Sequence, residues 1–394
     1  MVTDAEANAP STDEGFMRRA VGIAEKAKRR TAPNPWVGAV IVASDGKTIL
    51  GEGYHHGPGQ AHGEVEAFRD ADKKGVTEEQ LKGATIYTTL EPCHRGPGKR
   101  TPPCDELVCS RKVRRCVIGK VDPDPTFGGA GVQTMKEAGV QVDVGIAEFD
   151  VQNSLRSYFH QRSTGTPYVV VKIATSLDGC IGCADKTSQW ITGPQAREDA
   201  GWLRADSQAI LVGSETAIKD KPRLTVRVPG DPDMASPPLR VVLDTKGRVR
   251  DGPLMDTTEV PTLIMTSKEH CPEDARSLWS SKGLQVCDIP LDPSTSTEEG
   301  PRLNLEAVLK ELAKRGVMQL MVEGGAVLQG ELIKRNLVQE LRVYIGATLL
   351  GSSAQSWART PLTSTISDAK FWKLRTVRQL GNDVCMEYEK AETA

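Results

Sequence analysis

Short apolar runs alternate with helix-like segments along the first half of the chain, and no other feature of the sequence constrains the fold as much. Four runs have the length and β-branched content of strands: 37–43, 84–90, 114–121 and 140–146. Four segments have helical character: 16–30, 62–75, 105–112 and 131–139. This order predicts a parallel or mixed sheet covered by helices, which is an α/β fold.

A polar segment interrupts this alternation near the middle of the chain. Residues 149–167 end in Ser-Thr-Gly-Thr-Pro, and a second series of strand-like runs begins at 168. With 394 residues, the chain is too long for one compact core. We therefore predict a disordered tail at 1–15, a first α/β domain at 16–160 and a second α/β domain at 161–394.

Charge and composition argue against several classes of function. Fifty Lys and Arg residues nearly balance 52 Asp and Glu residues, and aromatic residues make up only 5% of the chain, so nucleic acid is not expected as a partner. No apolar run has the length of a membrane span, and the first fifteen residues lack the apolar core of a secretory signal. Nine cysteines, several of them in strand-like runs, are typical of reduced thiols. We expect a cytoplasmic protein that acts on a small molecule.

Four residues of the first domain form a pattern with a known chemistry. His62 and Glu64 open one helix-like segment, Cys93 follows the run 84–90, and Cys104 opens the next helix-like segment. An H-x-E motif followed by P-C and a second cysteine is the signature of zinc deaminases. Two thiolates and one imidazole can hold Zn²⁺ and leave a fourth position for water, whose pKa the metal lowers. Glu64 can then carry a proton from the water to a leaving amine.

A structural zinc site is the alternative interpretation. Such a site needs a fourth protein ligand, and His94, next to Cys93, is the close candidate. Glu64 favours catalysis, because a purely structural site has no use for that carboxylate. The spacing is also unusual, since ten residues separate Cys93 from Cys104 where about two are typical of zinc deaminases.

Several longer motifs resemble the bifunctional riboflavin-biosynthesis deaminase/reductase family. They include TAPNPWVGAVIV, GYHHGPGQAHGEVEAF, TTLEPCHRGPGKRTPPCDELV, VVVKIATSLDG, SQWITGPQARE, LRADSQAILVGSET and MVEGGAVL. The resemblance extends from about Phe16 to the C-terminus. It implies an N-terminal cytidine-deaminase-like α/β/α domain, a C-terminal dihydrofolate-reductase-like α/β domain, and assembly as a homodimer or homotetramer.

The resemblance also implies two consecutive reactions. First, 2,5-diamino-6-(5-phosphoribosylamino)pyrimidin-4-one loses its ring 2-amino group to water at a zinc site. NADPH then reduces the ribosyl side chain of the product to a ribityl chain. In the deaminase half, the zinc ligands match His62, Cys93 and Cys104. The proton shuttle matches Glu64. The substrate-contacting positions match Asn34, His55, Lys99 and Arg100.

The second half has no G-x-G-x-x-G motif after a strand. Instead, Glu323, Gly324 and Gly325 lie between a strand-like and a helix-like run. Glycines there can bring backbone amides close to a phosphate, although a tight turn explains them equally well. The resemblance places Gly324 and Gly325 against the pyrophosphate of NADPH. Its other cofactor positions match Ala174, Trp190, Thr216, Asp220 and Thr245. Its substrate positions match Ser188, Thr192, Arg204, Leu224, Arg227 and Glu323.

Two arginines and two other polar residues have more specific expectations. Arg204 and Arg227 are predicted to clamp the ribose 5-phosphate, because a guanidinium binds phosphate through paired hydrogen bonds. Lys172 and Asp178 flank an apolar run and are either functional or structural.

The sequence departs from the family pattern at a few positions. Gly63 stands where the family usually has alanine, and the Cys93–Cys104 loop is longer by about two residues. Lys221 replaces a usual aspartate, and Cys180 replaces a usual basic residue and creates a C-x-x-C motif with Cys183. A redox or zinc site is one interpretation of that motif.

Two alternative functions remain open at the level of sequence. One is a deaminase of another base or nucleoside with a diverged reductase half. The other is a non-catalytic scaffold that keeps zinc for stability.

Overall fold

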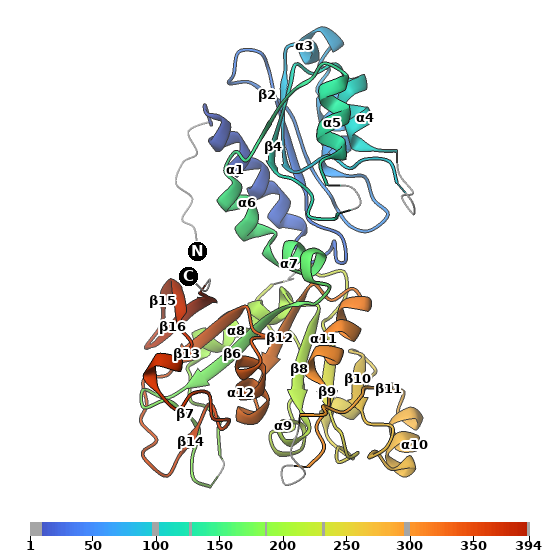
Figure 1. Ribbon diagram of the computed structural model, residues 1–394. Helices are drawn as coiled ribbons and strands as arrows, with labels where there is room; N and C mark the ends of the chain where they lie inside the picture. Colours follow the sequence, from blue (N-terminus) through green and yellow to red (C-terminus); the bar gives the residue numbers. More distant parts are fainter. Residues whose placement is uncertain are drawn as a thin grey trace. The chain divides into compact units, whose positions relative to one another are not determined.

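A computed structural model describes residues 10–96, 102–125, 128–185, 187–230, 233–294 and 300–391. The chain divides into two compact units, residues 1–164 and 165–394 (Figure 1). Residues 1–9 of the expected tail lie outside the described part. The expected extension of that tail to residue 15 is wrong, because the first helix begins at Asp13, where the Thr12 side chain accepts a hydrogen bond from the Gly15 amide.

The first unit contains a five-stranded sheet in the order β2-β1-β3-β4-β5. Strand β1 pairs antiparallel with β2 and β3, whereas β3, β4 and β5 are parallel. The strands are β1 (Gly38–Val42), β2 (Ile49–Tyr54), β3 (Thr85–Leu90), β4 (Arg115–Lys120) and β5 (Gln141–Val144). The helices are α1 (Asp13–Ala24), α2 (Gly63–Lys73), α3 (Glu78–Lys82), α4 (Cys104–Ser110), α5 (Ala130–Glu137), α6 (Glu148–Ser154) and α7 (Arg156–Thr164).

Helices cover both faces of this sheet. Helices α1 and α6 lie on one face, and α4 and α5 lie on the other (Figure 1). Ala67 and Phe68 of α2, Val108 of α4 and Met135 of α5 pack with Ile41 and other residues of the strands in one apolar cluster. Because helices cover both faces, every residue of β1 and β3 is buried, without the alternation of a half-exposed strand.

The second unit contains a nine-stranded sheet in the order β11-β10-β9-β8-β12-β6-β13-β16-β15. Neighbouring strands from β11 to β13 are parallel, and the last two pairings are antiparallel. The strands of this sheet are β6 (Tyr168–Thr175), β8 (Ala209–Gly213), β9 (Leu239–Leu243), β10 (Thr262–Thr266), β11 (Gln285–Asp288), β12 (Gln319–Glu323), β13 (Glu340–Ile345), β15 (Trp372–Leu380) and β16 (Asp383–Lys390). A small separate ribbon pairs β7 (Cys180–Gly182) with β14 (Gln355–Ser356).

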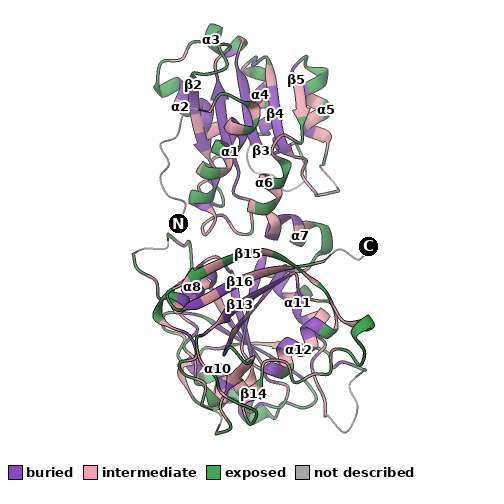
Figure 2. Cartoon of the chain, turned by 90° about the vertical axis from the view of Figure 1, so that its left-hand side faces the viewer, coloured by how far each residue is buried: buried purple, intermediate pink, exposed green. Residues whose placement is uncertain are grey.

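Helices also cover both faces of the parallel part of this sheet. The helices are α8 (Pro194–Ala205), α9 (Ser214–Lys219), α10 (Glu273–Ser281), α11 (Leu305–Lys314) and α12 (Ala326–Lys334). Leu312 of α11 and Leu332 of α12 pack on one face with Val171. On the other face, Trp279 of α10 packs with Ile210. The inner strands β8, β9, β10 and β12 are accordingly buried or nearly so, in contrast to the edge strands (Figure 2).

Some elements differ from what the sequence predicts. The polar segment 149–167, in which the sequence placed the domain boundary, largely folds as helices α6 and α7. Strand β2 was not predicted because Gly51 and Gly53 interrupt its apolar pattern. Strands β15 and β16 were not predicted either, because they carry charged residues throughout and lie at the half-exposed edge of the sheet. Among the described residues, no helix combines the length and the apolar character that a membrane span requires.

Strand β2 and helix α2 pack so closely that glycine is required between them. A Cβ atom on Gly53 would lie 2.2 Å from the Ala67 amide nitrogen. We therefore expect Gly53→Ala to lower the free energy of unfolding by about 1–3 kcal/mol, the usual cost of overpacking. Urea denaturation followed by circular dichroism would measure it.

Gly22 of α1 is the matched control. A Cβ on Gly22 would have no atom within 4 Å, so Gly22→Ala should leave stability unchanged or raise it by up to about 1 kcal/mol. Equal destabilisation by both variants would contradict the proposed close packing.

Candidate functional site

The three predicted zinc ligands of the first unit converge on one point. His62 is the residue before α2, Cys93 follows β3, and Cys104 is the first residue of α4. His62 Nδ1 lies 3.5 Å from Cys93 Sγ and 3.4 Å from Cys104 Sγ, and all three ligand atoms lie within 4.8 Å of one another. For tetrahedral zinc, N–Zn and S–Zn bonds of usual length would separate nitrogen from sulfur by roughly 3.6 Å. The donor set and its spacing therefore fit a zinc ion.

Backbone hydrogen bonds hold the two cysteines together. The amides of Cys104 and Asp105 donate to the Cys93 carbonyl oxygen at 3.0 and 3.3 Å, and the Cys104 amide also approaches Cys93 Sγ at 3.4 Å. A hydrogen bond with Cys104 lowers the pKa of Cys93 to about 4, and the same bond and burial raise the pKa of Cys104. A thiolate is the form that binds a metal.

Glu64 occupies the first turn of α2, beside these ligands. Its side chain is buried, and burial raises its pKa to about 7. Its Oε2 atom has no hydrogen-bond partner among the described residues. A buried acceptor without a partner is costly, and a water molecule or an amine next to the metal position would satisfy it.

The predicted substrate residues of this unit fall into two groups. Asn34 Nδ2 lies 3.3 Å from His55 Nε2, and His55 Nδ1 lies 3.0 Å from the Ala61 carbonyl oxygen. This arrangement places the proton of His55 on Nδ1, where it donates to Ala61, and burial lowers the pKa of the ring. The ring centroids of His55 and His62 are 5.3 Å apart, so Asn34 and His55 lie beside the metal ligands without being ligands themselves. Lys99 and Arg100 lie outside the described residues.

His94 does not join the metal ligands. Its Nδ1 atom lies 2.7 Å from Asp105 Oδ2. Among the described residues, the only cluster of metal-ligand type is His62 with Cys93 and Cys104. The fourth-ligand interpretation of His94 is therefore wrong. The same finding excludes a described metal cluster at Cys180 and Cys183, which are free thiols.

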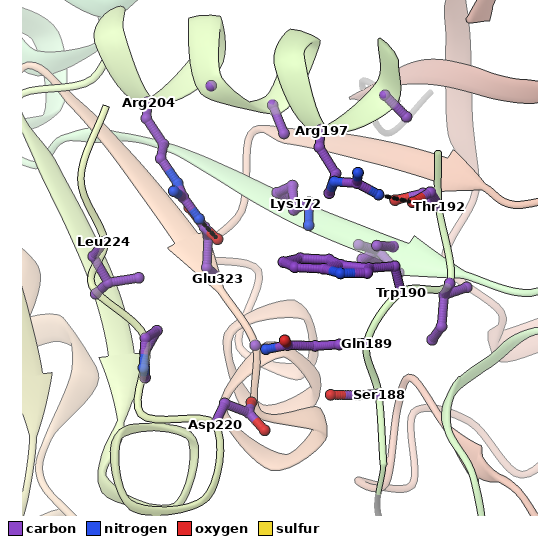
Figure 3. A pocket seen from close by; sticks show the side chains of 18 of the residues that line it. Lys172, Ser188, Gln189, Trp190, Thr192, Arg197, Arg204, Asp220, Leu224 and Glu323 are labelled. Carbon is purple, nitrogen blue, oxygen red and sulfur yellow. Dashed lines mark hydrogen bonds and ion pairs between the residues drawn. The ribbon is translucent and has the colours of Figure 1, made fainter. Parts of the chain in front are cut away.

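The second unit contains a cavity of about 940 Å³ at the carboxyl ends of β6, β8 and β12. All but one of the residues predicted for its cofactor and substrate line this cavity (Figure 3). They are Ala174, Ser188, Trp190, Thr192, Arg204, Thr216, Asp220, Leu224, Arg227, Glu323, Gly324 and Gly325. Thr245 is not among the lining residues. Gly324 has φ +73°, and a Cβ there would lie 3.1 Å from Thr216, so the glycine turn closely approaches α9.

Arg204 and Glu323 both line the cavity, and their side chains point toward each other (Figure 3). Arg204 donates to both carboxylate oxygens of Glu323, at 2.5 and 2.7 Å, and to the Thr225 carbonyl oxygen at 3.0 Å. Burial alone would raise the pKa of Glu323, but the charge of Arg204 lowers it overall. Because the guanidinium of Arg204 is already bonded to Glu323, its part in the expected phosphate clamp is in conflict with the structure. Arg227 lines the cavity, and its binding of the phosphate stays a prediction.

Three lining residues were left open or were not predicted. Arg197 of α8 lies 4.5 Å from the Trp190 ring centroid and donates to the Thr192 carbonyl oxygen at 2.7 Å. Gln189 precedes Trp190. Lys172, which the sequence left between a functional and a structural role, lies 5.8 Å from the Tyr344 ring centroid, and burial lowers its pKa. The charge of Lys172 within an otherwise apolar run was the one feature of the sequence that pointed to a possible function for it.

Lys221, a departure from the family pattern, and Asp178, which the sequence left between a functional and a structural role, lie outside the lining of the cavity. Lys221 pairs with the exposed Asp251 at 2.8 Å. Asp178 accepts hydrogen bonds from the Leu350 and Gly351 amides, which gives it a structural role in the loop after β6.

Comparison with known proteins covers both units. Residues 167–386 match the family model described as the RibD C-terminal domain, and residues 10–120 match the cytidine and deoxycytidylate deaminase zinc-binding region. Riboflavin biosynthesis protein RibD of Chlamydia pneumoniae is 39% identical over 95% of this chain and 94% of its own length. The Escherichia coli protein of the same name is 37% identical over 95% and 98%.

Solved structures agree with this result. RibD of Acinetobacter baumannii superposes with a TM-score of 0.82 at 33% identity, over 96% of this chain and 99% of that one. A diaminohydroxyphosphoribosylaminopyrimidine deaminase/5-amino-6-(5-phosphoribosylamino)uracil reductase of Thermotoga maritima superposes with a TM-score of 0.80 at 29% identity, over the same shares. The predicted fold of both halves is thereby confirmed.

Proposed function

The chain belongs to the RibD family of bifunctional deaminase/reductase enzymes of riboflavin biosynthesis, and from this membership we propose which residues carry its two reactions. The proposed first step is hydrolytic deamination of 2,5-diamino-6-(5-phosphoribosylamino)pyrimidin-4-one. The second is reduction of the ribosyl side chain of the product by NADPH. The name of the Thermotoga maritima relative supports these substrates.

The observation that carries the deaminase proposal is the buried carboxylate of Glu64 beside three metal-ligand atoms, with its Oε2 atom unpartnered among the described residues. A zinc ion held by His62, Cys93 and Cys104 would supply the Lewis acidity that activates a water molecule. Glu64 then accepts a proton from the attacking water and returns it to the leaving amine. A pKa raised to about 7 by burial is suited to a group that must do both.

Asn34 and His55 are proposed to hold the pyrimidine. The Asn34 amide is fixed by His55, which is itself fixed by the Ala61 carbonyl. This chain of hydrogen bonds orients the remaining polar atoms of Asn34 without a cost at the moment of binding. Zinc as a purely structural element gives no reason for a buried acid without a partner, so the scaffold alternative is disfavoured.

The reductase cavity is proposed to bind NADPH and the sugar phosphate together. About 300–1,000 Å³ is usual for ligand sites, and the cavity is near the upper end of that range. The Gly324–Gly325 turn lies at the start of α12, where backbone amides can receive the pyrophosphate. Glu323, held in place by Arg204, can accept a hydrogen bond from a sugar hydroxyl, and Arg227 can bind the phosphate.

The alternative of a diverged reductase with another substrate has less support. Lys221, which together with the longer Cys93–Cys104 loop left room for this alternative, pairs with Asp251 at 2.8 Å and does not line the cavity. Twelve of the thirteen residues that the resemblance implies for this half line the cavity.

We also propose that the second unit mediates self-association. Strand β15 is the edge of the nine-stranded sheet, and Phe371, Leu374 and Val377 on or beside it are 71%, 49% and 57% exposed. Exposed apolar side chains on an edge strand offer a surface for pairing, even though charged residues also occur along β15, and a second copy of this chain is the proposed partner.

Deamination should depend on Glu64 alone among the acids of its turn. Glu64→Gln removes the proton carrier and should slow ammonia release by at least about 10²-fold, while bound zinc and NADPH oxidation remain. Glu66→Gln is the control, because Glu66 lies in the same turn but pairs with Arg69 away from the ligands. Loss of reductase activity in Glu64→Gln would contradict two separate sites.

Arg227 should act on substrate binding without supporting the fold. Arg227→Met is expected to raise KM for the phosphorylated substrate of reduction about tenfold, since a charge-assisted phosphate contact is lost, with an unchanged melting temperature. Arg223→Met, four residues away and outside the cavity lining, is the control and should behave as wild type. An unchanged KM in Arg227→Met would refute the assignment.

Self-association should depend on the apolar face of β15. Val377→Lys is expected to shift the protein toward monomer in sedimentation velocity, because it places a charge in the proposed interface. Ile366→Lys replaces an apolar residue that is 84% exposed outside the strand and should not change the sedimentation coefficient. A monomeric wild-type protein would overturn the proposal.

A further inference from the structure

The residues that directly follow the two cysteines are bonded to each other. His94 Nδ1 lies 2.7 Å from Asp105 Oδ2, and the Asp105 side chain is fully buried. We propose that His94, Asp105 and Thr134 form a clasp that closes the base of the Cys93–Cys104 loop and fixes the relative position of the two thiolates. His94 is then a positioning residue and not a ligand. This inference rests on the zinc site proposed above.

Asp105 is a rigid anchor for this clasp. It lies in the first turn of α4, where free amides and the helix dipole favour a carboxylate. Its Oδ1 atom accepts a hydrogen bond from the Glu106 amide at 2.8 Å, and Oδ2 faces His94. Because no water reaches this carboxylate, loss of His94 would leave Oδ2 buried without its partner, which is unfavourable.

Thr134 of α5 supports the imidazole from a second side. Its hydroxyl donates to the Ala130 carbonyl oxygen at 3.1 Å and lies 3.3 Å from His94 Nδ1. Since that hydroxyl proton is already used and Asp105 can only accept, Nδ1 is the protonated nitrogen and points at both oxygens. The position of the ring is therefore defined by two separate helices.

The start of α5 is itself fixed to the segment that carries Cys93. Glu91 accepts hydrogen bonds from the amides of Asp122, Gly129 and Val132, at 3.2, 2.9 and 3.1 Å. A Cβ on Gly131 would lie 2.4 Å from the Pro92 carbonyl oxygen. Glu91, two residues before Cys93, thus holds the helix that carries Thr134, and the clasp closes a ring of contacts around this ligand.

A second side-chain pair crosses the same loop and provides a built-in comparison. Arg95 pairs with Glu106 at 3.1 Å, across the same sequence separation as His94 and Asp105. The side chains of Arg95 and Glu106 are 75% and 47% exposed. Exposed pairs of this kind contribute little, so removal of Arg95 should not move the cysteines.

The test compares variants of the full-length zinc enzyme. His94→Ala removes the clasp. His94→Asn keeps an N–H donor close to the position of Nδ1, and Arg95→Ala removes only the exposed pair. Three quantities are measured for each: the rate of zinc transfer to a chromophoric chelator, the thiolate-to-metal absorption of the cobalt-substituted protein, and kcat and KM for ammonia release. NADPH oxidation by the same samples monitors the other unit.

His94→Ala should release zinc about tenfold faster and lose about tenfold in kcat, which is the lower end of the effect of residues that orient metal ligands. Its cobalt absorption should shift, because the sulfur geometry changes. His94→Asn should recover most of both effects, and Arg95→Ala should match wild type. If His94→Ala does not fold, Thr134→Val should still release zinc about two- to threefold faster, in keeping with the loss of the weaker contact.

Three results would overturn the clasp alone: wild-type zinc release and cobalt absorption in a folded His94→Ala, no recovery in His94→Asn, or an equal effect in Arg95→Ala. Wild-type zinc release by Thr134→Val, where His94→Ala does not fold, would do the same. A wild-type chain that binds no zinc would instead overturn the proposed deaminase site, and the clasp with it.

Discussion

The convergence of three ligand atoms from separate segments is the constraint on which the first unit depends. His62, Cys93 and Cys104 come from the starts of two helices and the end of β3, yet their atoms lie within 4.8 Å. Each segment must therefore be positioned to a fraction of an ångström. Gly53 allows α2 to touch β2, and Glu91 anchors the loop and helix next to Cys93. The fold supplies rigidity before any ligand binds.

In the second unit, a buried ion pair holds one functional side chain in position. Arg204 of α8 and Glu323 of β12 meet in the wall of the cavity. Such a pair is expensive to desolvate and gains little over apolar packing, so stability alone gives little reason to keep it. It does hold one carboxylate at a fixed position beside the glycine turn. The strand ends of a parallel sheet are the usual place for such groups, because each strand delivers its last residue to the same edge.

The sequence predicted the elements with a strong apolar signal, and failed where polar residues or glycines form strands. Strands β1, β3 and β6 were recognised from runs rich in β-branched residues, whereas charged residues recur along β15 and β16. The candidate metal ligands could be picked out because their residue types and their order along the chain match the chemistry of a zinc site. The ion pair between Arg204 and Glu323 could not be predicted, because two residues 119 positions apart in the sequence leave no local pattern. The same holds for Arg197 above Trp190.

The extra length of the Cys93–Cys104 loop is only a small obstacle to holding both cysteines at one metal site. Closing a loop of ten residues instead of eight costs only about 0.2 kcal/mol more, because the entropy of closure grows with the logarithm of length. A longer loop fixes the orientation of its two ends less firmly, since added residues leave each cysteine freer to rotate. Backbone bonds from Cys104 and Asp105 to the Cys93 carbonyl restore the distance between the ends, and contacts of His94 with Asp105 and Thr134 restrict the rotation. In this chain, the metal geometry and the extra length are compatible because the residues next to the ligands are bonded to each other.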